Sequence, residues 1–160
     1  MGIKAHGIDS VSKFFKGYMK IVHEEMSRTL SYLGEQCVRH ARDRAQEDSW
    51  YDHTGNLRSS IGYAIYEKGR KTIESEFPIV KEGADGADEG RRMLDDLARM
   101  YSDTYTLVVV AAMNYAEFVE SLDNKDVLAS AELMAQSKIN EYLVRTKRLV
   151  EQRVEKELRF

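Results

Sequence analysis

The residue types of a hydrolase occur together in one short segment of this 160-residue chain. Asp52, His53, Ser59 and Ser60 lie close in sequence, and a Ser–His–Asp set can supply a nucleophile, a general base and the group that orients the base. Neighbouring residues on one turn rarely point at one another, and the segment has neither the nucleophile elbow nor the oxyanion loop of such enzymes. The sequence therefore predicts no catalytic residue here and no enzyme.

Histidine, cysteine and glycine positions give no metal-binding or phosphate-binding pattern. His23 is followed by Glu-Glu-Met-Ser and lacks the second histidine of a zinc helix. Cys37 and His40 lie three residues apart, which makes two ligands rather than the four of a structural zinc site. The glycines between Gly83 and Gly90 are followed by no Gly-Lys-Ser/Thr, and the acids among them repel phosphate. We therefore expect no metal and no cofactor.

Composition and charge narrow the class of protein further. The chain has 24 Lys and Arg against 27 Asp and Glu, a net charge of −3, and it lacks the basic excess of duplex-binding proteins. The longest apolar stretch, residues 107–113, is far shorter than the roughly 20 residues that span a bilayer. The single cysteine, Cys37, cannot form an internal disulfide. We expect a protein made in the cytoplasm, with no membrane and no specific nucleic acid as partner.

A long amphipathic helix is predicted over residues 11–48, where apolar residues recur in steps of three and four. A straight helix of this length measures about 57 Å, against about 40 Å for a compact domain of this size. We therefore expect the helix either to overhang the domain or to break at Gly34. An overhanging apolar stripe needs a partner, so Phe14, Phe15 and Tyr18 are expected to pack against the C-terminal helix or a neighbouring subunit.

The remaining patterns predict an α+β fold in a single domain over 1–160. It has a small mixed or antiparallel sheet of about three strands, packed against long N- and C-terminal helices. A short helix is also expected from Asn114, after the last strand. The other elements expected along the chain are a hairpin over 61–77, a mobile Gly- and Asp-rich loop over 79–88, a short helix over 89–101, a core strand over 104–112 and a C-terminal helix over 126–159.

Two segments resemble sequence blocks of one phage family. His53-Thr-Gly-Asn-Leu-Arg-Ser-Ser-Ile61 resembles the family's Thr-Gly-x-Leu-Arg-x-Ser-Ile block, and Asn114-Tyr-Ala-Glu-Phe-Val-Glu120 resembles its Tyr-Ala-x-x-Val-Glu block. The family comprises the tail-component proteins similar to gene product ten of phage Hong Kong ninety-seven, small virion proteins of the head–tail junction or tail completion step. Members commonly continue with a Gly-Thr turn and a Pro-Phe-Leu-x-Pro-Ala segment. Here residues 121–131 stand there instead, and only Leu128 and Ala131 keep the pattern.

The resemblance implies a structural role without catalysis. Such proteins are expected to assemble as rings, through head-to-tail contacts around an axis, and to dock onto other phage tail or connector proteins. Their location is then the virion, and the bacterial host cytoplasm during assembly. An alternative class is a cytosolic, non-catalytic interaction or regulatory module that presents its basic C-terminal helix to an acidic partner. The expected interface residues are Phe14, Phe15, Tyr18, Thr54, Gly55, Asn56, Leu57, Arg58, Ser60, Tyr115, Val119 and Glu120.

Overall fold

The chain forms two compact units, which we call unit 1 and unit 2. Unit 1 lies within residues 1–29 and 140–160, and unit 2 within residues 30–139. Two long helices, α1 (Ile8–Arg42) and α5 (Ala129–Glu157), contribute to both units, so the single domain stays a prediction. The computed structural model describes residues 7–43, 51–101, 105–114, 116 and 126–158.

Unit 2 contains a three-stranded antiparallel sheet in the order β2-β1-β3. β1 (Ile61–Glu67) and β2 (Arg70–Glu74) form the predicted hairpin, and β3 (Tyr105–Ala111) is the predicted apolar strand. Lys68 and Gly69 connect the hairpin with positive φ angles of 50° and 76°, which a two-residue type I′ turn requires. The α+β class and the small sheet with long terminal helices are confirmed.

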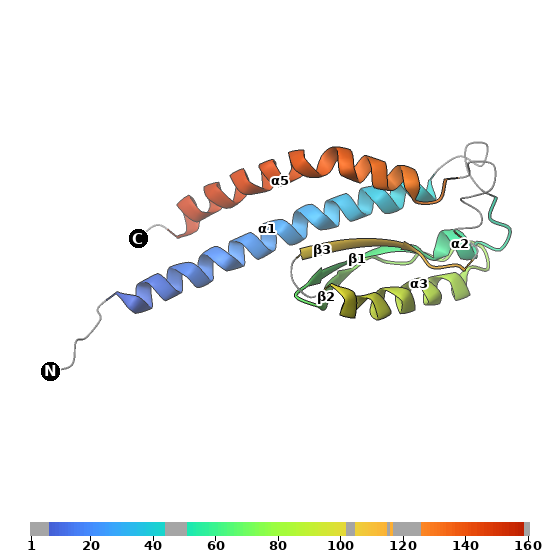
Figure 1. The fold of residues 1–160 in the computed structure, drawn as a ribbon, viewed down its shortest axis with the longest axis horizontal. Helices are drawn as coiled ribbons and strands as arrows, with labels where there is room; N and C mark the ends of the chain where they lie inside the picture. Colours follow the sequence, from blue (N-terminus) through green and yellow to red (C-terminus); the bar gives the residue numbers. More distant parts are fainter. Residues whose placement is uncertain (1–6, 44–50, 102–104, 115, 117–125, 159–160) are drawn as a thin grey trace. The chain divides into compact units, whose positions relative to one another are not determined.

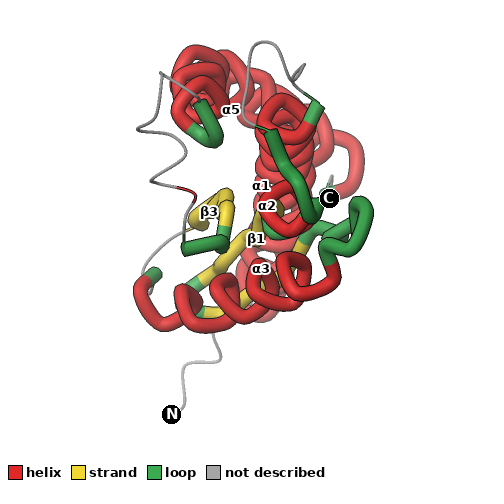
Figure 2. The backbone as a smooth tube through the Cα atoms, turned by 90° about the vertical axis from the view of Figure 1, so that its right-hand side faces the viewer, coloured by secondary structure: helices red, strands yellow, loops and turns green. Residues whose placement is uncertain are grey.

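Helices cover both faces of this sheet, as Figure 1 and Figure 2 show. The helix α3 (Ala84–Leu97), followed by a 3-10 turn over Ala98–Met100, lies on one face. Here the buried Tyr66 hydroxyl donates a hydrogen bond of 2.5 Å to the Leu94 carbonyl, and burial raises the pKa of Tyr66 to about 12. The core on this face comprises Ala64, Tyr66, Phe77, Ala87, Leu94 and Val110.

The opposite face of the sheet packs against α1. One of the two outcomes predicted for this helix, a break at Gly34, does not occur. The helix continues through Gly34 without a break. A Cβ atom at Gly34 would lie 2.6 Å from the ring of Tyr63 on β1, so this glycine lets the strand approach the helix closely. Gly34 therefore serves packing, and its low helix propensity is offset by the contact that it permits.

The first helix does not run unbroken to its predicted end at residue 48, because α1 ends at Arg42 and Asp43 forms a bend. Residues 44–48 of that prediction lie outside the described residues. Contacts from distant segments hold this end: Arg58 donates to the Arg42 carbonyl, and the Arg42 guanidinium donates to the Pro78 carbonyl at 2.6 Å. Both contacts therefore tie the end of α1 to residues far away in the chain.

The predicted mobile loop over 79–88 is wrong from Ala84 onward, because α3 already begins there, whereas residues 79–83 form loop and turn. The glycines that suggested flexibility allow close packing instead. A Cβ at Gly86 would lie 2.0 Å from the Asn56 carbonyl oxygen, and one at Gly90 would lie 2.3 Å from the Phe77 ring. The side chain of Asn56 also accepts a hydrogen bond of 3.2 Å from the Gly86 N–H. The predicted helix over 89–101 is therefore the second part of α3 and its 3-10 turn.

The other predicted boundaries need smaller corrections. β2 ends at Glu74 rather than at residue 77, because Phe77 turns into the core beneath Gly62 and Gly90. α5 begins at Ala129 rather than at residue 126; Asp126 precedes it, and its carboxylate accepts the Ser130 N–H at 3.0 Å. The helix predicted from Asn114 falls almost wholly outside the described residues.

Unit 1 is an antiparallel pair formed by the first part of α1 and the last part of α5. Thr29 and Thr146 share a hydrogen bond of 2.6 Å, and the side chain of Leu158 packs on Gly17. Between these contacts lies Glu25, which is only 1 % exposed and accepts hydrogen bonds from Arg153 at 3.0 Å and Arg28 at 3.1 Å. Removing one partner of this buried pair would leave an uncompensated buried charge.

Candidate assembly surfaces

The first sequence block forms a tight corner in unit 2, which begins at Asp52. This carboxylate is 5 % exposed and accepts two backbone hydrogen bonds, from Gly55 N–H at 2.9 Å and from Arg58 N–H at 2.8 Å. The second bond takes up one of the free N–H groups at the start of α2 (Asn56–Ser59). Lys81 adds a hydrogen bond of 2.5 Å to the Asp52 carbonyl. A single carboxylate thus fixes the turn and the short helix that follows.

Gly55 is required in this corner for two reasons. Its φ angle of 84° lies in the left-handed region, and a Cβ there would meet the Val80 carbonyl oxygen at 1.9 Å. The segment before α3 is hydrogen-bonded to the first sequence block. The Val80 N–H donates to Ser59 Oγ at 2.9 Å, and the Glu82 N–H donates to the Thr54 carbonyl at 3.1 Å.

Most of the predicted interface residues in this block therefore have roles inside unit 2. Leu57 is buried, the Ser60 hydroxyl donates to the Leu57 carbonyl at 2.8 Å, and Arg58 donates to the end of α1. Asn56 binds Gly86, as described above. Thr54 is the exposed member, and its hydroxyl accepts a long bond of 3.3 Å from the Asn56 N–H. The geometry makes this block a structural corner.

Most of the second sequence block lies outside the described residues. Tyr115, Val119 and Glu120 lie outside the described residues. Asn114 is exposed and Ala116 is buried, and the Ala116 N–H donates to the Met113 carbonyl at 2.8 Å.

An exposed apolar stripe runs along α1 in unit 1. Phe15 is 60 % exposed and Val11 69 % exposed, and Tyr18 and Met19 are exposed as well. Phe14 differs, since it is half-buried. The predicted set of Phe14, Phe15 and Tyr18 is thus divided: Phe14 is covered in part, whereas Phe15 and Tyr18 face outward. We call Val11, Phe15, Tyr18 and Met19 the α1 stripe.

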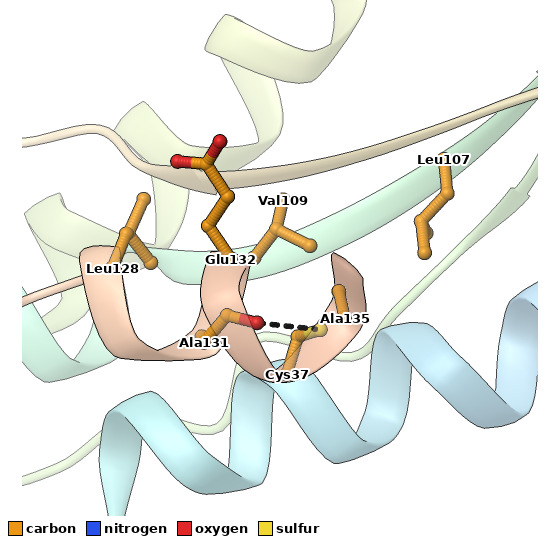
Figure 3. Close-up of a pocket in the computed structure, with 7 residues that line it drawn as sticks. All are labelled: Cys37, Leu107, Val109, Leu128, Ala131, Glu132 and Ala135. Atoms are coloured by element: carbon orange, nitrogen blue, oxygen red, sulfur yellow. Dashed lines mark hydrogen bonds between the residues drawn. The ribbon is translucent and has the colours of Figure 1, made fainter. Parts of the chain in front are cut away.

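An apolar cavity of about 270 Å³ lies in unit 2 between α1, β3 and α5, as Figure 3 shows. Cys37 is buried at its floor, where its thiol contacts the Ala131 carbonyl at 3.8 Å. Burial raises the pKa of this thiol, and Lys138 lowers it by less. Among the described lining residues, the one charged group is Glu132, on the exposed side of α5. The remaining lining residues are Leu107, Val109, Leu128 and Ala135. We call this the Cys37 cavity.

A second hollow in unit 2, of about 460 Å³, is polar and carries three arginines. Two of them, Arg42 and Arg58, donate to backbone carbonyls, and the third is Arg39. Burial lowers the pKa of Arg42, as does Arg58, while Asp43 raises it. Among the described residues, Glu35 and Asp43 line the same hollow and offset part of the positive charge of the arginines.

The residue types of a hydrolase do not assemble into a catalytic set. The ring of His53 lies against Tyr51 at a centroid distance of 4.2 Å, and the hydroxyls of Ser59 and Ser60 serve the backbone contacts described above. His40 contacts the Ser130 hydroxyl at 2.8 Å rather than Cys37. Within the described part of the chain, no group of three or more His, Cys, Asp or Glu side chains is placed to hold a metal ion.

Comparison of the chain with protein-family models, with curated protein sequences and with solved structures finds no match. Among the residues that the structure describes, no helix is both long enough and apolar enough to cross a membrane.

The Cys37 cavity is the feature that the sequence did not predict. Leu107 and Val109 have the alternation that places both on one face of β3. Ala131 and Ala135 are small residues one helical turn apart on α5, a spacing that leaves room beside a helix. Each pattern is common, and no sequence signal indicates that the two would face each other across Cys37.

Proposed function

We propose that this chain is a structural virion protein of a tailed phage or prophage. It acts at the head–tail junction or at the tail completion step, without a catalytic reaction, and assembles with further copies of itself and with tail or connector proteins. The proposal places the protein in the virion, and in the bacterial host cytoplasm during assembly.

The proposal rests on the order and spacing of the two sequence blocks, at residues 53–61 and 114–120. The structure adds support on one point, which is assembly. The α1 stripe presents four large apolar side chains, with Val11 and Phe15 more than half exposed. Exposed apolar residues that gather in one patch mark interaction sites. This stripe is the observation that supports an assembling protein.

The regulatory alternative receives less support from the C-terminal helix. Its Arg153 is engaged by three carboxylates, at 2.8 Å by Glu24, 3.0 Å by Glu25 and 2.7 Å by Glu157. Lys147 lies 4.0 Å from Glu151. Arg153 and Lys147 thus have carboxylate partners within unit 1, which lowers the charge that these two groups offer to an acidic protein.

Deletion of the gene from its phage or prophage tests the proposal. We expect induced cells to make capsids and tails that do not join, or tails of abnormal end structure, in electron micrographs, and a plasmid copy to restore complete particles. Mass spectrometry of purified particles should detect the chain. Normal infectious particles from the deletion strain, without the chain in wild-type particles, would overturn the proposal in favour of the regulatory alternative.

A further inference from the structure

Unit 1 and unit 2 carry opposite net charges, although the whole chain is close to neutral. Unit 1 has 11 Lys and Arg against 7 Asp and Glu, a net charge of +4. Unit 2 has 13 Lys and Arg against 20 Asp and Glu, a net charge of −7. A contact between unit 1 of one copy and unit 2 of another is therefore attractive, whereas contacts between like units are repulsive.

The apolar surfaces of the two units are also complementary. The α1 stripe of unit 1 presents the ring of Phe15, followed directly by the exposed Lys16. The Cys37 cavity of unit 2 is apolar inside, with the Glu132 carboxylate among its lining groups. Its volume of about 270 Å³ exceeds the roughly 150 Å³ in which an apolar protein cavity accepts benzene. The cavity is therefore large enough for a phenyl ring.

We infer that the chain associates head to tail, with the α1 stripe of one copy bound to unit 2 of the next and the Phe15 ring seated in the Cys37 cavity. This inference rests on the self-assembly proposed above and names the surfaces that carry it. Because the two surfaces differ, each copy has one of each kind, and the contact repeats until a rotation closes it into a ring.

Two single variants, one on each surface, test this contact. Phe15→Ser removes the ring from the α1 stripe, and Glu132→Lys reverses the charge at the cavity. Both side chains are exposed in the free chain, so circular dichroism of both variants should match that of the wild type. The matched controls are Tyr32→Ser, an exposed aromatic residue of α1 in unit 2, and Glu155→Lys, an exposed carboxylate of α5 in unit 1.

Sedimentation velocity over a concentration series gives the first result. We expect the mass of the wild type to rise with concentration, less steeply at 0.5 M salt than at 0.05 M salt because screening weakens the attraction. Each single variant should need at least tenfold higher concentration to associate, and the controls should follow the wild type. A wild type that stays monomeric at the highest concentration, or a control that weakens association as much as its partner variant, overturns the inference.

A mixture of the two variants gives the sharper result. Phe15→Ser retains the cavity and Glu132→Lys retains the α1 stripe, so the mixture should form a one-to-one dimer that does not grow. A mixture that remains monomeric refutes head-to-tail binding through this cavity.

These outcomes are separate from those of the gene deletion. Self-association lost in the variants, with normal particles from the deletion strain, would support this contact and overturn the virion role. Particles that fail without the gene, with a monomeric wild type, would support the virion role and refute the contact.

Discussion

The corner at Asp52 gives a prediction that separates a structural role of the first sequence block from an interface role. Replacing Asp52 by Ala removes the acceptor of two backbone N–H groups, those of Gly55 and Arg58. The first N–H is buried and the second is partly buried, so water can replace the lost acceptor only in part. An unsatisfied buried donor costs about 1–3 kcal/mol. We therefore expect the free energy of unfolding to fall by about 2–5 kcal/mol.

Asp52→Asn refines the test, because its amide keeps one acceptor oxygen and turns an N–H₂ group toward the other donor. One of the two bonds is then retained, and the expected loss is about 1–3 kcal/mol. Thr54→Ala is the matched control in the same turn. It removes a bond of 3.3 Å at an exposed position, so its loss should stay within about 0.5 kcal/mol.

Urea unfolding followed by circular dichroism at 222 nm measures all three variants. Equal slopes against urea would show that the native and unfolded states expose similar surface in each case, so that the midpoints report stability alone. A loss below about 1 kcal/mol for Asp52→Ala, or a loss for Thr54→Ala as large as that for Asp52→Ala, would refute the reasoning from the two N–H donors. The block would then be free to serve as an interface.

Three further predictions concern the cores of the two units. Leu94→Ala should lower the free energy of unfolding by about 2–5 kcal/mol in urea melts, because it opens a cavity beneath a fully buried residue. Burial raises the pKa of Tyr66 from its ordinary value of 10 to about 12. The part of the free energy of unfolding that this shift contributes is therefore fully present below pH 10 and is lost as the pH rises through 12. Absorbance at 295 nm should follow the ionisation, and thermal melts should follow the loss of stability. Arg153→Leu leaves the buried Glu25 with Arg28 alone and should lower the melting temperature by calorimetry. The double variant with Glu25→Leu should recover part of the loss, and a double variant less stable than Arg153→Leu would contradict this account of unit 1.

The fold class could be predicted from the sequence because its signals are local. Steps of three and four place the apolar residues of α1 on one side, alternation marks the two strands of the hairpin, and a continuous apolar run marks β3. The hairpin turn follows from Gly69, whose positive φ angle suits the type I′ geometry. These patterns depend on backbone geometry within a few residues, so they hold whatever the rest of the chain does.

The candidate surfaces could be predicted only in part. The apolar periodicity of the N-terminal helix placed Phe15 and Tyr18 on a stripe that needs a partner, and both are exposed. The same periodicity could not separate Phe14 from them, because which side of a helix is covered depends on how the partner helix packs. The roles of Arg58 and Ser60 inside unit 2 were likewise outside the reach of a sequence pattern.

Only the tertiary structure decided the elements whose limits depend on distant residues. The carbonyl of Arg42, at the end of α1, accepts a hydrogen bond from the distant Arg58, and Gly86 in the first turn of α3 allows the backbone of Asn56 to approach. A Gly- and Asp-rich segment is flexible in isolation and becomes helical where close packing offsets the entropy of ordering it. The Cys37 cavity arises in the same way, from small residues of α5 facing β3. The sequence by itself determined which residues can form helices and strands. Long-range packing determined where they end and which surfaces stay open, since those energies come from atoms far apart in the chain.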